Sequence, residues 1–485
     1  MTSDAQKSIS PFFISGQVVR CLVLFFVLAA GGCAPEAEET YDVVLSGGRV
    51  MDPASGMDGV RNVGIRGGSI AMISDDELAG ERVIDVAGLV VAPGFIDLHE
   101  HGQTDEAYRF MVRDGVTTAL ELEVGTGNIA EWYTARDGGQ VVNYGVSIGH
   151  IPVRMIVMED RGEWLPSGLA TTEPASPEQI DEMARLIGEG LAQGAVAVGF
   201  GIAYTPAATV EEFETMLRVG LDHGSGAHIH TRGGMEGLAE AIAGARNTGA
   251  SVHIVHSNSS GGSNSHEFLE MIQAARSEGL DVTTEAYPYE ASATRIESAL
   301  FDDWETWDDE QFEIHQWVAT GERLNRESFG RYRAEGGSII SHSRTEEMTL
   351  AAISHPLTMI ASDGKLENGR GHPRSTGSYA KVLGRYVREL GVLDLMDALR
   401  RMTIAPAERL QQRAHSMTQK GRIRMGSDAD LTIFNPDTVI DRSTYTEPDV
   451  PSEGIEYVLV NGVVVVDEGE LVEGVRPGKP IRSLR

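Results

Sequence analysis

The sequence predicts an α/β protein, a (β/α)₈ barrel with a small β-sandwich domain formed by both ends of the chain. Two observations support this prediction. The middle of the chain, residues 93–415, alternates short apolar segments with amphipathic ones, and eight of the apolar segments have the length of buried strands. The two flanks, residues 41–92 and 416–485, contain short apolar runs broken by Gly, Asp and Pro, which is typical of antiparallel strands.

The first 40 residues have the pattern of an export signal. Lys7 and Arg20 precede the apolar run Cys21–Ala30, and the sequence Ala-Gly-Gly before Cys33 resembles a lipobox. The run is too short to cross a membrane as a helix. We therefore expect residues 1–32 to be a lipoprotein signal peptide and residues 33–40 a tether. The mature protein would be lipid-anchored at a bacterial membrane, on the periplasmic face or in the cell envelope. A soluble protein with a frayed apolar N-terminus is the alternative.

Charge and cysteine content limit the partners and the chemistry. The 485 residues include 72 acidic and 40 basic ones, a formal net charge of −32, which repels phosphate backbones and argues against nucleic acid as a partner. Of the two cysteines, Cys21 would leave with the signal peptide, so Cys33 alone would remain and no intrachain disulfide could form. A metal site would therefore use His, Asp, Glu or a modified Lys.

The barrel strands can be assigned in chain order. We expect them at residues 94–101, 117–124, 141–150, 195–200, 226–231, 251–256, 280–287 and 357–363. Helices are expected at residues 177–190, 210–220, 235–248 and 266–278. A doubly wound open sheet is the competing fold, but no Gly-rich phosphate loop follows the first strand. An acidic, Trp-rich stretch, Phe301–Val318, interrupts the rhythm after the seventh strand and predicts an inserted loop or lid near residues 290–345.

Candidate metal ligands fall at the carboxyl ends of several expected strands. His99 and His101 close the first strand, and their i, i+2 spacing places both imidazoles on one face. This H-x-H pattern alone is weak, but His230, His256 and Asp363 close the fifth, sixth and eighth strands. Active sites of such barrels lie at that rim. The sequence therefore predicts one or two divalent ions, zinc first, with manganese or iron as alternatives.

Several motifs resemble the amidohydrolase superfamily and, within it, the N-acyl-D-amino-acid deacylases (D-aminoacylases). They include PGFIDLHEHG, HIHTR, VHIVHSN, TTEAYPYEASAT, GHPRSTGSYAKVLGRYVRE and SDADLTIFNPDTV, and the resemblance runs from about Tyr41 to the C-terminus. It implies a TIM-like metal-dependent hydrolase barrel that cleaves an amide of a D-amino acid. It also implies that His99, His101, His230 and His256 bind metal, that Asp363 is a ligand or the catalytic base, and that Tyr204, Tyr287 and Arg374 line the substrate pocket.

The chain departs from the family pattern on the second strand. Family members usually have a cysteine there, whereas residues 115–125 contain none, and strict alignment places Val124 at that position. We propose that Glu123, or else Glu121, replaces the thiolate as a metal ligand. The alternative is that one of these glutamates only supports a ligand histidine. Two acids on a buried strand favour a nearby cation.

A second departure follows the sixth strand, where the family often has a lysine that helps to hold the substrate carboxylate. This chain has Asn258, which carries no charge. Arg374, Arg295 and Arg232 are the available cations, and guanidinium groups bind carboxylates well. We expect Arg374, Arg295 and Asn258 to contact the substrate.

These observations predict a hydrolase of carbon–nitrogen bonds other than peptide bonds, an amidohydrolase acting on a small-molecule amide. Metal-bound hydroxide would attack the amide of an N-acyl-D-amino acid or a related D-peptide, with Asp363 as proton acceptor and donor. The alternatives are a cyclic-amide hydrolase of the dihydroorotase or hydantoinase kind, a dipeptidase on the same metal site, and a binding lipoprotein without catalysis.

Overall fold

The computed structural model describes residues 40–483, and its central feature is a barrel sheet of eight parallel strands in sequential order. The strands are β6 (Phe95–Asp97), β7 (Val116–Thr126), β8 (Asn143–Gly149), β9 (Val198–Gly201), β10 (Ala227–His230), β11 (Val252–Ile254), β12 (Val282–Ala286) and β16 (Thr358–Ile360). Asp363 N donates to His99 O at 2.8 Å, which joins the segment after the last strand to the segment after the first. Six of the eight strands lie within their predicted segments, whereas β7 extends beyond its segment at both ends and β9 ends one residue later than predicted.

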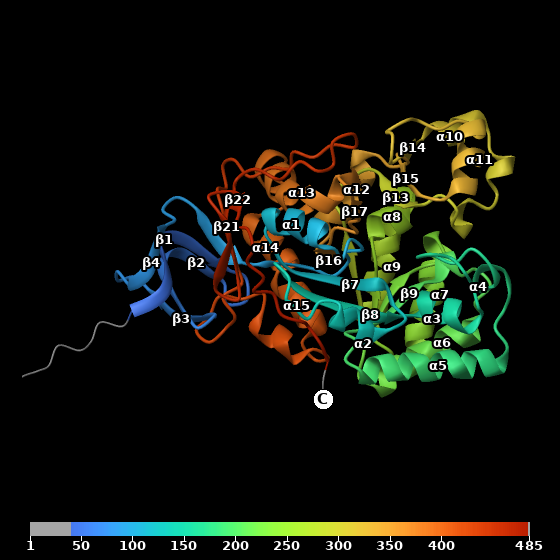
Figure 1. Cartoon of the computed structure of the whole chain (residues 1–485), viewed down its shortest axis with the longest axis horizontal. Coiled ribbons are helices and arrows are strands. Elements are labelled where there is room, and N and C mark those ends of the chain that lie inside the picture. The colour runs from blue at the N-terminus through green and yellow to red at the C-terminus, as the bar shows by residue number, and fades with distance from the viewer. Residues whose placement is uncertain (1–39, 484–485) are drawn as a thin grey trace, which may run out of the picture. The chain divides into compact units, whose positions relative to one another are not determined.

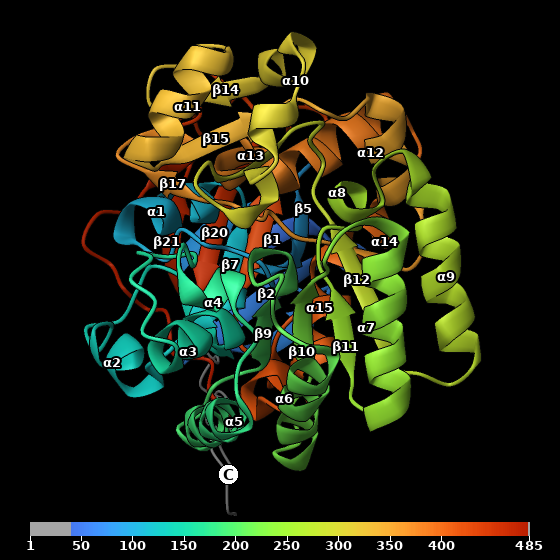
Figure 2. The ribbon, with the colours of Figure 1, turned by 90° about the vertical axis from the view of Figure 1, so that its right-hand side faces the viewer.

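Helices cover the outside of this sheet (Figures 1 and 2). They are α1 (Asp105–Arg113), α2 (Ile129–Thr134), α3 (His150–Val157), α4 (Leu169–Thr172), α5 (Pro177–Ala192), α6 (Val210–Asp222), α7 (Gly234–Thr248), α8 (Ser257–Gly261), α9 (Ser265–Ser277), α12 (Glu346–Ser354), α13 (Arg374–Lys381), α14 (Leu395–Met402) and α15 (Ile404–Leu410), with a π-helical stretch at Val382–Glu389. The four predicted helices correspond to α5, α6, α7 and α9. Ser176 begins α5 with a capping box, and the Thr209 side chain caps α6.

Both ends of the described chain join in one nine-stranded sheet, drawn in blue and red in Figure 1. Its strands are β1 (Thr40–Asp52), β2 (Met57–Arg66), β3 (Ser69–Ser74), β4 (Ala79–Asp85), β5 (Val90–Pro93), β19 (Leu431–Phe434), β20 (Ile455–Val460), β21 (Val463–Asp467) and β22 (Glu470–Leu471). The hairpin turn at Asn461-Gly462 joins β20 to β21, with φ of 47° and 79° as a type I′ turn requires.

A buried ion-pair network attaches this sheet to the barrel. Lys420 Nζ donates to Asp428 Oδ2 at 2.9 Å and to Asp430 Oδ2 at 2.6 Å. Asn143 on β8 donates to the same oxygen of Asp430 at 3.0 Å. A buried charge needs such partners, because an unpaired one would lose its hydration without compensation. The network fixes the composite sheet against the barrel wall.

The segment predicted as a loop or lid is a small structure with its own core. It contains β13 (Ser292–Arg295), β14 (His315–Trp317), β15 (Ser338–Ser341), α10 (Asp309–Glu313) and α11 (Arg326–Glu335), drawn in yellow in Figures 1 and 2. The antiparallel strands have the order β13-β15-β14, and Phe301, Phe312 and Phe329 form the centre of an apolar cluster. Within this segment β13 is the strand closest in sequence to the barrel, and its residues lie at the rim formed by the carboxyl ends of the barrel strands.

Short 3₁₀ turns and one hairpin complete the structure. They are η1 (Ile202–Tyr204), η2 (Gly262–Asn264), η3 (Ala299–Phe301), η4 (Trp304–Thr306) and η6 (His415–Gln419), with the hairpin β17 (Leu366–Glu367) and β18 (Arg370–Gly371). Within residues 40–483, no helix has the length and apolar character needed to span a membrane. The predicted signal peptide and Cys33 lie outside the described residues.

Candidate metal centre

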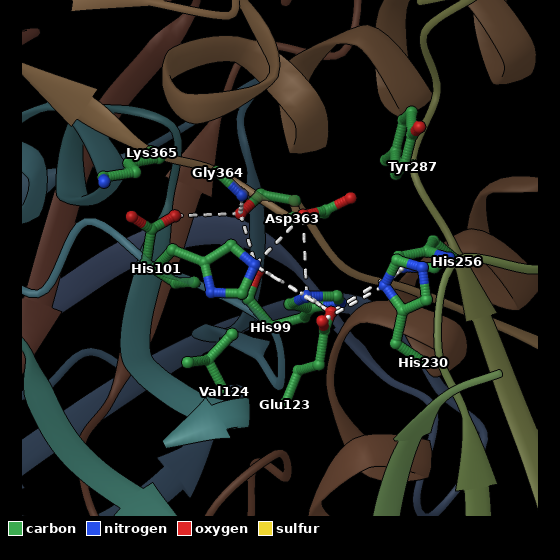
Figure 3. Close-up of polar contacts among 12 residues, drawn as sticks. His99, His101, Glu123, Val124, His230, His256, Tyr287, Asp363, Gly364 and Lys365 are labelled. Carbon is green, nitrogen blue, oxygen red and sulfur yellow. Dashed lines mark hydrogen bonds and ion pairs between the residues drawn. The ribbon is translucent and has the colours of Figure 1, made fainter. Parts of the chain in front are cut away.

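The predicted ligands converge at the carboxyl ends of the barrel strands (Figure 3). His99 and His101 follow β6, Glu123 lies on β7, His230 ends β10, His256 follows β11 and Asp363 follows β16. The side chains form two groups of possible metal ligands, one of His99, His101 and Asp363 and the other of Glu123, His230 and His256. Within each group the ligand atoms lie within 4.8 Å of one another. Residues far apart in sequence thus meet as predicted from the strand order.

Glu123 lies between the two groups (Figure 3). Its Oε2 is 2.7 Å from His99 Nε2 and 3.7 Å from His256 Nε2, and its Oε1 is 3.2 Å from His230 Nδ1. Burial alone raises the pKa of the Glu123 carboxyl, but the His230 and His99 imidazoles outweigh burial and hold that pKa well below its usual range. An ionised carboxylate whose two oxygens face histidines would be a suitable ligand for a divalent cation.

Glu121, the other candidate ligand on β7, has a different position from Glu123. Its Oε2 lies 2.5 Å from His101 Nδ1, and its Oε1 accepts hydrogen bonds from the backbone N–H groups of Glu123 and Val124. The β7–β8 pairing is irregular between Glu121 and Thr126, so simple alternation does not hold there. Glu121 therefore contacts the rear nitrogen of His101, and Val124 packs in an apolar cluster.

Asp363 faces the first ligand group and an arginine. Its Oδ1 is 3.3 Å from His101 Nε2 and 3.5 Å from His99 Nε2, while its Oδ2 is 2.9 Å from Arg374 Nη1. Burial raises the pKa of the Asp363 carboxyl, but the Arg374 guanidinium and the His99 imidazole lower it by more, so the net shift is downward. The carboxylate is therefore the stable form and can accept a proton.

Two of the candidate ligands have strained backbone conformations. His256 has φ of 37° and Asp363 has φ of 53°, a left-handed region that residues other than glycine seldom adopt. Such conformations cost free energy and occur where the surrounding structure requires a particular side-chain direction. Both side chains point to the same centre as a result (Figure 3).

A cavity of about 390 Å³ opens onto the candidate ligands. Of the predicted substrate-binding residues, Tyr204, Arg295 and Arg374 line it. The Tyr204 ring contacts the His230 ring at 4.8 Å between centroids, and Arg295 Nε is held by Glu297 Oε1 at 2.5 Å. The further lining residues that sequence reasoning missed include Trp164, Trp317 and Lys365. Trp164 packs edge-on against His101, with ring centroids 5.0 Å apart.

Tyr287 and Asn258 are not among the described residues that line this cavity. The Tyr287 side chain is buried, and its hydroxyl accepts a hydrogen bond from Arg344 Nη2 at 2.5 Å. Asn258 is also buried, and its Nδ2 donates to the Tyr287 carbonyl at 3.0 Å. The structure therefore places these two side chains behind the cavity wall, and the missing lysine charge is not replaced at position 258.

Two buried residues beneath the centre were not predicted to take part in the site. Glu285 Oε1 lies 2.6 Å from His99 Nδ1, and Glu285 Oε2 lies 3.0 Å from His253 Nε2. An acidic residue within an otherwise buried strand is a sequence signal for an internal partner, because an unpaired carboxylate would be costly there. The partner itself could not be identified from strand assignments alone.

The donor set fits divalent metal ions. Both groups combine imidazole nitrogens with a carboxylate, which zinc and other first-row ions accept. Most of these side chains are buried, so a group of clustered histidines and carboxylates without a cation would be electrostatically unfavourable. The residues present therefore agree with the predicted metal site.

Comparison with known proteins establishes the family. Residues 152–466 match the model of the amidohydrolase family. An N-acyl-D-glutamate deacylase of Alcaligenes xylosoxydans xylosoxydans is 30% identical, and the alignment covers 92% of this chain and 97% of that protein. The chain belongs to the amidohydrolase family. The predictions of family, of fold class and of a hydrolase acting on carbon–nitrogen bonds other than peptide bonds are confirmed.

Two solved structures are similar to this amidohydrolase over most of its length. The structure of an N-acyl-D-glutamate deacylase from Bordetella bronchiseptica, complexed with zinc and a phosphonate inhibitor, has a TM-score of 0.81 at 26% identity and covers 92% of this chain and 100% of that chain. A D-aminoacylase described as having a binuclear metal centre has a TM-score of 0.77 at 28% identity, with 91% and 100% covered.

Proposed function

We propose that this amidohydrolase is an N-acyl-D-amino-acid deacylase with one or two zinc ions. The observation that carries the proposal is the pairing of Asp363 with Arg374 beside the ligand groups. It places a proton acceptor and a cation on one cavity wall, with Arg374 Nη1 2.9 Å from Asp363 Oδ2. An N-acyl-amino acid carries a scissile amide next to a carboxylate. Hydrolysis of the amide requires the proton acceptor, and binding of the carboxylate requires the cation.

Zinc would be held by His99, His101, Glu123, His230, His256 and Asp363. A bound zinc ion lowers the pKa of water and polarises a carbonyl oxygen. The relative from Bordetella bronchiseptica was solved with zinc, which supports this choice. Glu123 replaces the thiolate that the family usually has, and a carboxylate also accepts manganese and iron.

Asp363 performs the proton transfers. It accepts the proton of the attacking water as the water adds to the amide carbonyl carbon. It then donates that proton to the leaving nitrogen, since a free amide anion is a very poor leaving group. The downward shift of its pKa keeps Asp363 ionised, the form in which a carboxyl group accepts a proton.

Arg374 binds the substrate carboxylate. Its side chain is buried and lines the cavity, and its Nε has no hydrogen-bond partner among residues 40–483. The guanidinium lies over the Tyr287 ring, with Cζ 4.5 Å from the ring centroid, and this cation–π contact helps to hold it in position. A buried guanidinium with a free donor is suited to a carboxylate. The D configuration of the substrate is supported by the deacylase relatives.

A hydrolysis panel tests the proposal. We expect the zinc-loaded enzyme to hydrolyse N-acetyl-D-amino acids, with the L enantiomers and cyclic imides hydrolysed much more slowly. Release of the free amino acid, quantified by chiral chromatography, is the measurement. The panel includes N-acetyl-D-glutamate and N-acetyl-D-methionine with their L counterparts, dihydroorotate and a hydantoin. Faster turnover of a cyclic amide than of every N-acyl-D-amino acid would contradict the proposal.

We also propose that the mature protein begins at Cys33 and is lipid-anchored at a bacterial membrane. The support is the sequence alone, since residues 1–39 lie outside the described structure. The basic residues Lys7 and Arg20, the apolar run Cys21–Ala30 and the small residues before Cys33 have the order of a lipoprotein signal. An anchored enzyme would act on small amides outside the cytoplasm.

Metabolic labelling tests the anchor. With a radioactive fatty acid supplied to cells, we expect label in the wild-type protein and none in the Cys33→Ser variant, because the thiol is the predicted attachment site. Mass spectrometry of the purified N-terminus should find residue 33 first. Equal labelling of both proteins, or an intact N-terminus, would contradict lipidation at Cys33.

A further inference from the structure

The barrel interior beneath the candidate metal centre is polar. Glu285 on β12 and His253 on β11 are both buried there, and His228 on β10 packs against His253 with ring centroids 4.6 Å apart. Barrel interiors are normally filled with branched apolar side chains. Burying a carboxylate and imidazoles costs free energy unless they are paired, so these side chains need interaction partners.

Glu285 contacts the nitrogen of His99 that faces away from the other ligands. His99 Nδ1 lies 2.6 Å from Glu285 Oε1, while His99 Nε2 faces Glu123 Oε2 at 2.7 Å. When Nδ1 donates its hydrogen to a carboxylate, Nε2 keeps the lone pair that binds a metal. The contact therefore selects the tautomer and the ring orientation that a metal site requires.

The second carboxylate oxygen of Glu285, Oε2, also has a buried partner. His253 Nε2 lies 3.0 Å from Glu285 Oε2, and His253 Nδ1 lies 2.7 Å from Thr283 Oγ1. The carboxylate is thus held at both oxygens, at Oε1 by the candidate ligand His99 and at Oε2 by His253, which belongs to neither ligand group. In addition, β12 pairs with β16, with Glu285 opposite Met359, so Glu285 is anchored to the strand that leads to Asp363.

The second histidine of the H-x-H pattern has the same kind of support from another strand. His101 Nδ1 lies 2.5 Å from Glu121 Oε2 on β7. Each imidazole therefore has a carboxylate on Nδ1 and presents Nε2 to the centre. The repetition shows that the contact follows from the geometry of the site and is not a single chance pairing.

We propose that Glu285 is a positioning residue for the metal-binding His99, and that His253 holds Glu285 in place. This inference rests on the proposed metal-dependent function. Glu285 acts through His99, so it controls how tightly the metal is bound, and it does not contact the substrate. His253 acts on His99 only through Glu285, so replacing His253 weakens metal binding less than replacing Glu285 does.

Zinc affinity of the Glu285→Gln variant tests the inference, measured on metal-free protein by competition with a chromophoric chelator. We expect zinc to bind about 10–100-fold more weakly than in the wild type, as for other residues that support a ligand histidine. The cobalt-loaded variant should also show a shifted visible absorption spectrum, because the ligand field at His99 changes. His253→Gln should weaken zinc binding less than Glu285→Gln does.

The matched control is His150→Gln. His150 Nε2 lies 2.7 Å from Glu212 Oε1 in a similarly buried imidazole–carboxylate pair, and neither residue belongs to the ligand groups. Both variants should lower the melting temperature of metal-free protein, but only Glu285→Gln should weaken zinc binding. If Glu285→Gln binds zinc within about twofold of wild type, Glu285 has only a structural role. If the wild type itself does not bind zinc, the proposed function is wrong as well.

Discussion

Asp363→Asn is expected to lower kcat by about 10²–10⁴-fold, the usual contribution of general acid–base catalysis. Asparagine has nearly the same shape, so packing and the Asp363 N to His99 O hydrogen bond should persist. It cannot accept the proton of the attacking water or return it to the leaving nitrogen. The second ligand group does not include residue 363, so we expect zinc to remain bound. Steady-state kinetics with an N-acetyl-D-amino acid and zinc analysis of the same preparation are the measurements.

Asp114→Asn is a matched control for the loss of a buried carboxylate. Asp114 accepts hydrogen bonds from the backbone N–H groups of Tyr379 and Ala380, and it does not line the cavity. We expect this variant to keep kcat within a few-fold of wild type even if it is less stable. Retention of near wild-type kcat by Asp363→Asn would show that another group transfers the proton.

The meeting of the candidate ligands at one rim could be predicted from the sequence because it depends on strand order alone. His230 and His256 close short apolar segments, and parallel strands in sequential order place all such ends at the same edge. The choice between Glu121 and Glu123 could not be made in this way. It depends on an irregular pairing between β7 and β8, which follows from contacts with a neighbouring strand and not from the β7 sequence.

Residues whose role depends on partners distant in sequence were the ones missed or misplaced. Glu285 meets His99 across the barrel, 186 positions away in sequence. Asn258 was expected to contact the substrate because of its place in a motif, but its amide donates to the backbone carbonyl of Tyr287. The inserted segment was expected to be a loop or lid, and the core that Phe312 and Phe329 give it was not predicted. Periodicity describes one element at a time and cannot supply such pairings.

Glu123→Gln is expected to remove most of the zinc from the purified protein. The wild-type carboxylate offers Oε2 to His99 at 2.7 Å and Oε1 to His230 at 3.2 Å, so it faces both ligand groups at once. The neutral amide has one oxygen and no charge, and it would leave clustered buried imidazoles without their central anion. Plasma emission spectroscopy after gel filtration measures the zinc content. Activity should fall in parallel and recover only in part at high zinc concentration.

Glu121→Gln separates a direct ligand from a supporting residue on the same strand. Glu121 Oε2 contacts only the rear nitrogen of His101, at 2.5 Å, so its replacement should weaken zinc binding by about 10–100-fold and leave zinc measurable in the purified protein. Glu123→Gln should lose far more. Because a carboxylate is a harder ligand than a thiolate, the wild type should also be activated by manganese or iron. Full zinc occupancy in Glu123→Gln, or loss of zinc in Glu121→Gln alone, would assign the ligand role to the other glutamate or to neither.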